Sequence, residues 1–119
     1  MATKDGVRKF LSNLEVKSKI HPIIFRNDRG KNQQALLDLE ITPLQRETIL
    51  KTLTIEDYSE GPIPDTLNKG SEMWVFGKTV EKKEVYIKIT LGSQNYPIIC
   101  ISFHIAEYTM NYPLKTEES

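Results

Sequence analysis

Apolar residues recur every three or four positions near the start of the chain, which is typical of an amphipathic helix. They are Val7, Phe10, Leu11 and Leu14. The pattern predicts a helix over residues 4–18, within a basic amphipathic segment 1–20 whose lysines lie on the outer face. Since a residue before proline disfavours helical dihedral angles, we expect the helix to end before Pro22 and His21 to lie in a loop.

Shorter elements are expected before residue 66. Residues 22–25 are typical of an edge strand and residues 31–39 of a helix. Residues 42–45 form a capping box with proline at the first helical position, which predicts a third helix. The buried positions expected on these two helices are Ala35, Leu36, Leu39, Leu44, Ile49 and Leu53. Residues 54–57 are expected to begin another helical turn, whereas residues 61–65 are expected to break all regular structure.

From residue 73 onward the apolar period falls to two, which predicts three strands over residues 73–80, 84–91 and 98–106. Their short connections imply antiparallel neighbours. The apolar rows are Val85, Ile87, Ile89 and Leu91 on the second strand and Ile99, Ile101, Phe103 and Ile105 on the third. Because these rows must share one face, the opposite face is expected to hold Tyr86, Lys88, Ser102 and His104, with Cys100 on the same side.

The first of these strands admits two registers. A three-residue turn places Lys78 opposite Tyr86 on the polar face, with Trp74 and Phe76 beside it, whereas a two-residue turn places residues 73, 75 and 77 there. We favour the first register because it groups Lys78 with the other polar side chains. The predicted class is α+β, with N-terminal helices packed on the apolar face of a C-terminal antiparallel sheet of three or more strands.

The length of 119 residues suits a single domain over residues 1–119, with residues 115–119 expected to be a disordered tail. No apolar run approaches the roughly 18 residues needed to cross a bilayer. The lone cysteine, Cys100, cannot form an internal disulfide, which fits a reducing compartment. We therefore expect a cytoplasmic protein without membrane association, in which Cys100 is a buried structural residue.

The formal net charge of +0 argues on its own against a nucleic-acid partner. The charge is nevertheless uneven: residues 1–31 hold eight basic and three acidic residues, and residues 32–72 hold three basic and eight acidic residues. These regions act as separate patches because salt screens charges that are more than about 8–10 Å apart. Ordinary solvated helix faces are the alternative explanation.

The polar sheet face gathers side chains that suit metal-independent cleavage of RNA. The 2′-hydroxyl of RNA is a built-in nucleophile, so an enzyme needs a base for its proton, cations for the phosphate and an acid for the leaving oxygen. Lys78 and Lys88 supply positive charge, Tyr86 supplies a hydroxyl, and His104 can give or take a proton. An ordinary solvated surface is the alternative.

No cofactor or metal is expected. His21 and His104 lack the histidine or cysteine companions that zinc needs, and no glycine-rich phosphate loop follows a strand. Cys100 and His104 are four residues apart on one strand, or about 13 Å, which is too far for a thiolate dyad.

A family likeness lies in four segments of the chain, residues 53–58, 73–74, 85–90 and 101–104. Its most specific part is a tyrosine-x-lysine strand followed by a strand that ends in serine, phenylalanine and a basic residue. In order and spacing these segments resemble the motility quorum-sensing regulator family of mRNA interferase toxins, over residues 35–104. The resemblance implies a RelE-like fold, ribosome-independent endoribonuclease activity on mRNA and a cognate antitoxin encoded beside the toxin. Tyr86 matches the active-site tyrosine of the family, and Lys88 matches its strand lysine.

Three positions differ from the family pattern. His104 and Glu60 stand where the family has catalytic lysines, and Val75 stands where it has a glutamine. These differences lead to the hypothesis that Glu60 and His104 act as base and acid, as in microbial ribonucleases, with Lys78 and Lys88 holding the phosphate. A solvated loop carboxylate is the alternative interpretation of Glu60.

Two classes of function follow from these patterns. The first is a toxin endoribonuclease that cleaves single-stranded mRNA, inhibits translation and growth, and is neutralised by a cognate antitoxin protein. The acidic stretch with Glu56, Asp57, Glu60 and Asp65 is then a docking surface for a basic antitoxin segment. The second is a non-catalytic protein-binding or regulatory module that uses the open sheet face or the basic N-terminal helix.

Overall fold

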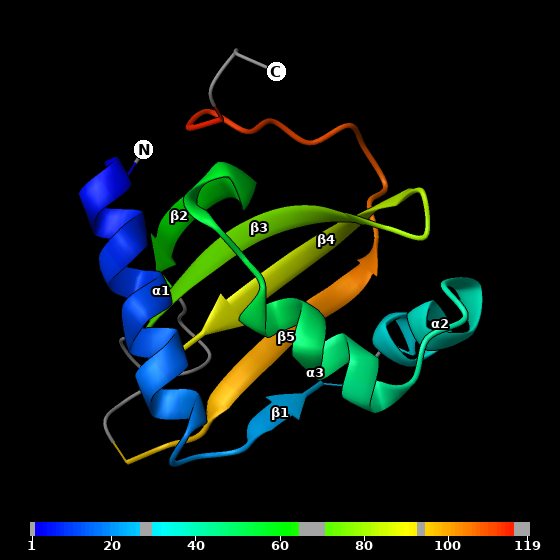
Figure 1. Cartoon of the computed structure of the whole chain (residues 1–119), viewed down its shortest axis with the longest axis horizontal. Helices are drawn as coiled ribbons and strands as arrows, with labels where there is room; N and C mark the ends of the chain where they lie inside the picture. Colours follow the sequence, from blue (N-terminus) through cyan, green and yellow to red (C-terminus); the bar gives the residue numbers. More distant parts are fainter. Residues whose placement is uncertain (1, 27–29, 65–70, 93–94, 116–119) are drawn as a thin grey trace.

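Within residues 2–26, 30–64, 71–92 and 95–115, which the computed structural model describes, the chain forms three α-helices, a short 3-10 helix and one five-stranded sheet (Figure 1). The helices are α1 (Lys4–Ser18), α2 (Lys31–Asp38), α3 (Pro43–Lys51) and the 3-10 helix η1 (Ile55–Asp57). The strands are β1 (Ile23–Phe25), β2 (Tyr58–Pro64), β3 (Glu72–Val80), β4 (Lys83–Thr90) and β5 (Ile98–Ile105). The predicted α+β class is confirmed.

The sheet has the strand order β1-β5-β4-β3-β2 and is mixed rather than purely antiparallel. β2, β3, β4 and β5 pair antiparallel, as their short connections predict, whereas β1 pairs parallel with β5. A parallel pair needs a long crossover, and here most of the chain separates Ile23 from its partner Ile98. The apolar run at residues 22–25 is thus an edge strand, as expected.

β2 overturns the expectation that residues 61–65 break all regular structure, because the strand runs through Gly61 and both prolines to Pro64. Its pairing with β3 shifts register on either side of Glu60. Prolines are tolerated here because β2 is an edge strand, whose outer side has no partner to receive a backbone donor. Asp65 lies outside the described residues.

One face of the sheet, the helix face, holds the hydrophobic core under α1 and α3 (Figure 1). Phe10 of α1 stacks on Trp74 and Phe76 of β3, with ring centroids 4.8 Å and 5.7 Å apart. From α3, the Arg46 guanidinium lies 3.8 Å from the centre of the Phe25 ring. The expectation that Trp74 and Phe76 share the polar face is therefore wrong.

The turn between β3 and β4 explains this error. Val80 pairs with Lys83, so the turn has two residues, Glu81 and Lys82, with φ angles of 50° and 68°. Two consecutive positive φ angles are typical of the hairpin turns that twist with their strands, and these turns usually carry asparagine or glycine. Glu81 and Lys82 give no such signal, so the turn itself did not decide between the two registers. Grouping Lys78 with the other polar side chains then favoured the register that is wrong.

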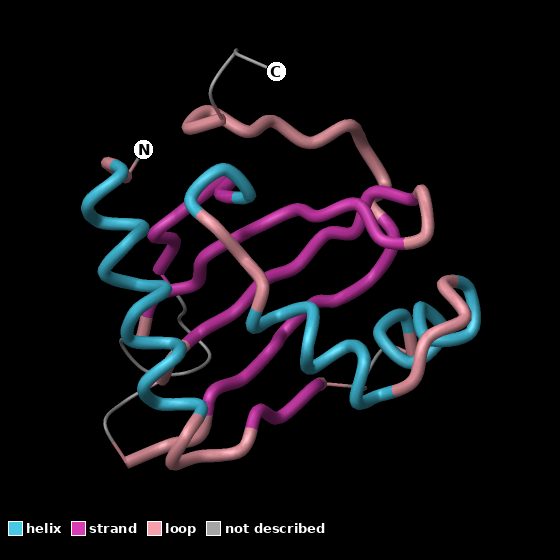
Figure 2. Tube along the Cα trace, viewed as in Figure 1, coloured by secondary structure: helices cyan, strands magenta, loops and turns pink. Residues whose placement is uncertain are grey.

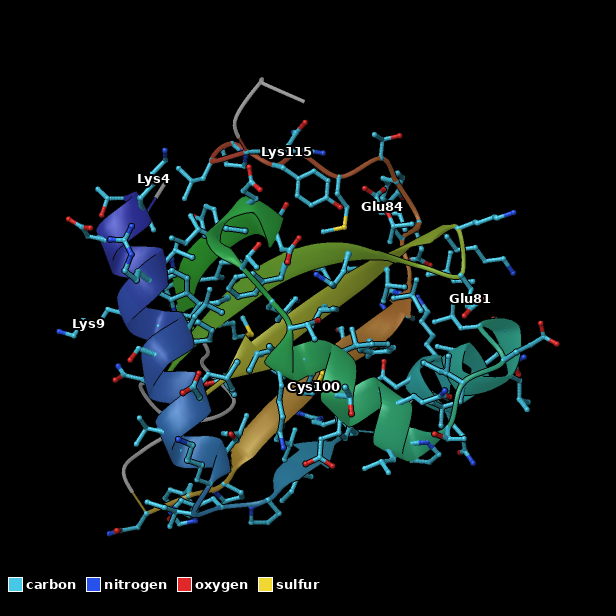
Figure 3. All side chains as sticks on the ribbon, viewed as in Figure 1. Lys4, Lys9, Glu81, Glu84, Cys100 and Lys115 are labelled. Carbon is cyan, nitrogen blue, oxygen red and sulfur yellow. The ribbon has the colours of Figure 1, made fainter. Side chains whose placement is uncertain are left out.

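A bulge in β5 causes a second departure from the predicted register. Lys88 lies opposite Ser102 and Ile89 lies opposite Cys100, which leaves Ile101 as the extra residue. The residues of β5 before the bulge therefore lie on the faces opposite to those predicted. Cys100 lies on the helix face and not on the polar face. Cys100 is fully buried, as expected for a structural cysteine, and lies behind α3 in the view of Figure 3.

The helix boundaries follow their capping residues. The Thr3 hydroxyl accepts from Gly6 N at the start of α1, whose bounds match the prediction, and Lys4 and Lys9 project away from the sheet (Figure 3). The capping box of α3 is present, and η1 forms the expected turn. Leu44 is 72% exposed, contrary to the prediction. It lies two residues, or about 200° of helix rotation, from the buried Arg46.

Candidate active site

The sheet face opposite the helices, here called the open face, carries the candidate site. Two adjacent rows cross it: Gly77, Tyr86 and His104 form one, and Val75, Lys88 and Ser102 form the other. The prediction that Tyr86, Lys88, Ser102 and His104 share one face is confirmed. All four side chains are partly exposed.

Tyr86 and His104 stack on each other. Their ring centroids are 5.4 Å apart and their planes differ by 16°. The Lys88 ammonium lies 5.8 Å from the centre of the Tyr86 ring, within the range of a cation–π interaction. A hydroxyl, an imidazole and a cation are thus grouped over two neighbouring strands.

A backbone contact orients the His104 imidazole. Its Nδ1 atom lies 3.0 Å from the Ile105 carbonyl oxygen. Because a carbonyl oxygen only accepts, Nδ1 is the protonated nitrogen in this arrangement, and in the neutral ring Nε2 keeps the lone pair. His104 therefore offers Nε2 as a base when the ring is neutral and as an acid when it is charged.

A shallow depression of about 480 Å³ borders His104 at the edge of the open face. It is lined by Gly30, Lys31, Gln34, Asp38, His104, Ile105 and Glu107. Lys31 Nζ and the Glu107 carboxylate form an ion pair at 3.0 Å. The hydrogen bond and charge of Lys31 lower the pKa of Glu107, and the charge of His104 adds to this shift.

Asn32 fixes α2, and with it Lys31, beside β5. β1 covers β5 only as far as Cys100, and beyond this point the Asn32 side chain takes the place of a neighbouring strand. Its amide donates to Ile101 O at 2.9 Å, and its carbonyl accepts from Phe103 N at 2.9 Å. The side chain is only 6% exposed, so these bonds are made in the protein interior.

The segment after β5, residues 106–115, folds back over β4 and β3 as an irregular loop (Figure 2). Glu84 holds it: Met110 N donates to one carboxylate oxygen at 3.3 Å, and the Tyr112 hydroxyl donates to the other at 2.6 Å (Figure 3). Gly77 makes room for it, because a Cβ atom there would lie 2.8 Å from Tyr112 Cε1 and from Met110 Sδ. Desolvation and the Glu84 carboxylate raise the pKa of Tyr112. This segment thus bounds the open face beside Tyr86, the partner of Gly77.

Lys78 lies on the helix face and not with Tyr86, Lys88 and His104. Its ammonium pairs with the Asp57 carboxylate at 3.1 Å and lies 3.4 Å from Thr52 O. Both side chains of the pair are largely buried, with 28% of Lys78 and 19% of Asp57 exposed. The register places Lys78 on the side of the sheet opposite to the candidate site.

Glu60 lies too far from His104 for the two to act on one phosphate group. It is exposed on β2 and pairs with Val75, and the strand order places β2 three strands from β5. At about 4.8 Å between strands, this separation is about 14 Å. The structure therefore brings Tyr86, Lys88 and His104 together and separates Lys78 and Glu60 from them.

The neighbours of the candidate site were missed by sequence reasoning. Lys31 and Glu107 are 76 positions apart, and no motif connects them. Tyr112 follows the last strand in a segment without periodicity. Gly77 was the available signal for the packing of this segment on β3, since a glycine inside a strand often marks the close approach of another group.

Among the described residues, no group of three or more histidine, cysteine, aspartate or glutamate side chains is placed to hold a metal ion. Within the same residues, no helix is long and apolar enough to cross a membrane. The chain matches no protein-family model, no curated protein and no solved structure.

Proposed function

We propose that the chain is a metal-independent endoribonuclease that cleaves single-stranded mRNA at Tyr86, Lys88 and His104, and that it acts as the toxin of a toxin-antitoxin pair. The observation that carries the proposal is the stacked Tyr86–His104 pair with Lys88 beside it on the open face. The resemblance of the surrounding strands to the mRNA interferase toxins, with its implied RelE-like fold, supports the same function.

The three side chains supply the groups that the reaction needs. His104 Nε2 accepts the proton of the 2′-hydroxyl, whose oxygen then attacks phosphorus. The bond from phosphorus to the 5′ oxygen breaks, and the Tyr86 hydroxyl donates a proton to that leaving oxygen. Lys88 stabilises the negative charge on the phosphate during the attack. The products are a 2′,3′-cyclic phosphate and a 5′-hydroxyl end, and solvent restores the protonation states of Tyr86 and His104.

The test is incubation of the purified protein with single-stranded RNA in EDTA, followed by analysis of the new ends. We expect 2′,3′-cyclic phosphate ends with the wild-type protein and a loss of about 10²–10⁴-fold in cleavage rate for His104→Ala and Tyr86→Phe. His21→Ala is the matched control, because His21 lies in the loop before β1. Intact RNA at high protein concentration would contradict the proposal and favour a non-catalytic binding module.

A cognate antitoxin is the proposed protein partner. Of the acidic stretch expected to receive it, Glu56 and Glu60 are exposed, whereas Asp57 is engaged with Lys78. A basic antitoxin segment on this surface would bind more weakly as salt increases. Growth arrest on expression, relieved by an adjacent small open reading frame, is the corresponding test in cells.

A further inference from the structure

The depression beside His104 contains a cation, Lys31, that pairs with an exposed carboxylate, Glu107. Lys31 is 53% exposed and Glu107 is 57% exposed, so both ends of this ion pair are open to solvent. Exposed pairs of this kind contribute little to stability, typically about 0–1 kcal/mol. A ligand with a stronger negative charge can therefore replace Glu107 at little cost to the fold.

The position of Lys31 is fixed although its side chain is exposed. The next residue, Asn32, is buried and bonded to β5 on both sides of Ser102, so the start of α2 cannot move freely relative to the candidate site. Beside it, the rim at Gly30 is open, since a Cβ atom there would meet nothing within 4 Å. The depression is thus an accessible hollow that Lys31, at the fixed start of α2, and His104, at the end of β5, both line.

We propose that this depression binds the phosphate group of the RNA strand that lies next to the phosphate cleaved at His104. Lys31 is the residue that binds this phosphate, and in the free protein Glu107 occupies its place as the partner of Lys31. The inference rests on the proposed function. A volume of about 480 Å³ leaves room for a nucleotide, and phosphodiester contacts by lysine position a strand without reading its sequence. The hydrogen bond and charge of Lys31, and to a smaller extent the charge of His104, lower the pKa of Glu107, and these are the two groups that would face the phosphate.

The test measures binding separately from cleavage. The probe is a short fluorescein-labelled oligonucleotide with 2′-O-methyl groups, which lacks the nucleophile and stays intact, and binding is followed by fluorescence anisotropy at several salt concentrations. We expect Lys31→Gln to weaken binding roughly threefold and to reduce the slope of log affinity against log salt by about 0.7, the value for one phosphate contact on a single strand. Glu107→Gln is expected to tighten binding, because it releases Lys31 from its partner.

Lys51→Gln is the matched control. Lys51 is 54% exposed and pairs with Glu47 at 3.9 Å, so its charge and exposure resemble those of Lys31, but it lies on α3 over the helix face. Equal losses for Lys31→Gln and Lys51→Gln would indicate general attraction and overturn the inference. The opposite effects of Lys31→Gln and Glu107→Gln support it, since a folding defect weakens binding in both variants.

The outcomes separate this inference from the proposed function. If the wild-type protein binds and cleaves RNA but Lys31→Gln binds with unchanged affinity and salt slope, only the phosphate site is overturned. If the wild-type protein binds no oligonucleotide, both are overturned.

Discussion

At the scale of single residues, Cys100 shows how burial changes the chemistry of one group. Burial raises the pKa of its thiol to about 12, against a smaller opposing effect of the Arg46 charge. Since the thiol is uncharged at neutral pH and fully buried, it is a poor nucleophile in the folded protein. This agrees with its place in the core and separates it from the partly exposed Tyr86 and His104.

The raised pKa of Cys100 predicts a loss of stability in alkali. The contribution is fully present below the ordinary thiol pKa of 9.0, and it decreases as the pH rises towards about 12, because only the unfolded chain ionises in this range. About 1 kcal/mol is then lost between pH 9 and 10, and the loss approaches about 1.4 kcal/mol per pH unit above this range. Urea unfolding at pH values between 9 and 10 measures this slope, to which Tyr112, whose pKa is also raised from its ordinary value of 10.0, adds in the upper part of the range.

Cys100→Ala is the corresponding variant. Its stability is expected to be lower at every pH, because a cavity replaces the thiol, but without the slope between pH 9 and 10 that this group causes. An unchanged slope in Cys100→Ala would contradict the explanation.

Gly77 carries a second prediction at this scale. A Cβ atom there would overlap the Tyr112 hydroxyl and lie 2.8 Å from Met110 Sδ, so Gly77→Ala is expected to displace residues 110–112 and destabilise the protein by about 1–3 kcal/mol. Thermal or urea unfolding measures the change.

Gly6→Ala is the matched control for Gly77→Ala, because the same substitution at this position is expected to raise the stability of the protein. A Cβ atom at Gly6 lies 3.4 Å from its nearest neighbour, Thr3 Oγ1, and alanine favours a helix by about 0.5–1 kcal/mol over glycine. Equal stability of Gly77→Ala and the wild type would mean that residues 110–112 do not pack on Gly77 in solution.

At the scale of elements, α2 takes the place of a strand. Asn32 donates to two carbonyl oxygens, Arg26 O and Ile101 O, and accepts from Phe103 N. Asn32→Asp keeps the acceptor but turns the donating amide into a carboxylate that faces two carbonyl oxygens. We expect a loss of about 2–4 kcal/mol, because the second oxygen of the buried carboxylate has no donor and faces two carbonyl oxygens.

The measurement for Asn32→Asp is chemical unfolding, with Asn13→Asp as its control. Asn13 is exposed on α1, so the same substitution there is expected to change stability by less than about 0.5 kcal/mol. A similarly small effect of Asn32→Asp would contradict the role of its side chain at the β5 edge.

The same scale shows what the sequence could and could not predict. Features determined by local chemistry agree with the structure. The Thr42 capping box marks the start of α3, and the spacing of Val7, Phe10 and Leu14 marks the buried side of α1. The β3–β4 turn and the β5 bulge were missed, because neither Lys82 nor Ile101 carries a local signal for these backbone conformations. Both features are determined by packing between strands, and each changes which side chains share a face.

At the scale of the whole molecule, the two faces of the sheet differ in their role. The helix face carries the packed core, whereas the open face carries partly exposed polar side chains between α2 and the segment 106–115. The predicted group of Tyr86, Lys88 and His104 is present on the open face. Its members lie together because apolar and polar side chains alternate along β4 and along the end of β5. Lys78 and Glu60 do not join it, since their positions depended on a turn and on an edge strand that the pattern did not predict.

This division predicts opposite effects for two lysines on opposite sheet faces. Lys78→Gln removes the largely buried pair with Asp57 and is expected to lower stability by about 1 kcal/mol, while RNA cleavage per folded molecule is unchanged. Lys88→Gln removes a cation next to Tyr86 on the open face and is expected to leave stability within about 0.5 kcal/mol while lowering kcat by about 10²–10³-fold. Urea unfolding and the cleavage assay in EDTA, made on the same preparations, give both quantities for each variant. If Lys78→Gln lost activity and Lys88→Gln kept it, the active site would lie on the helix face and the assignment of the two faces would be wrong.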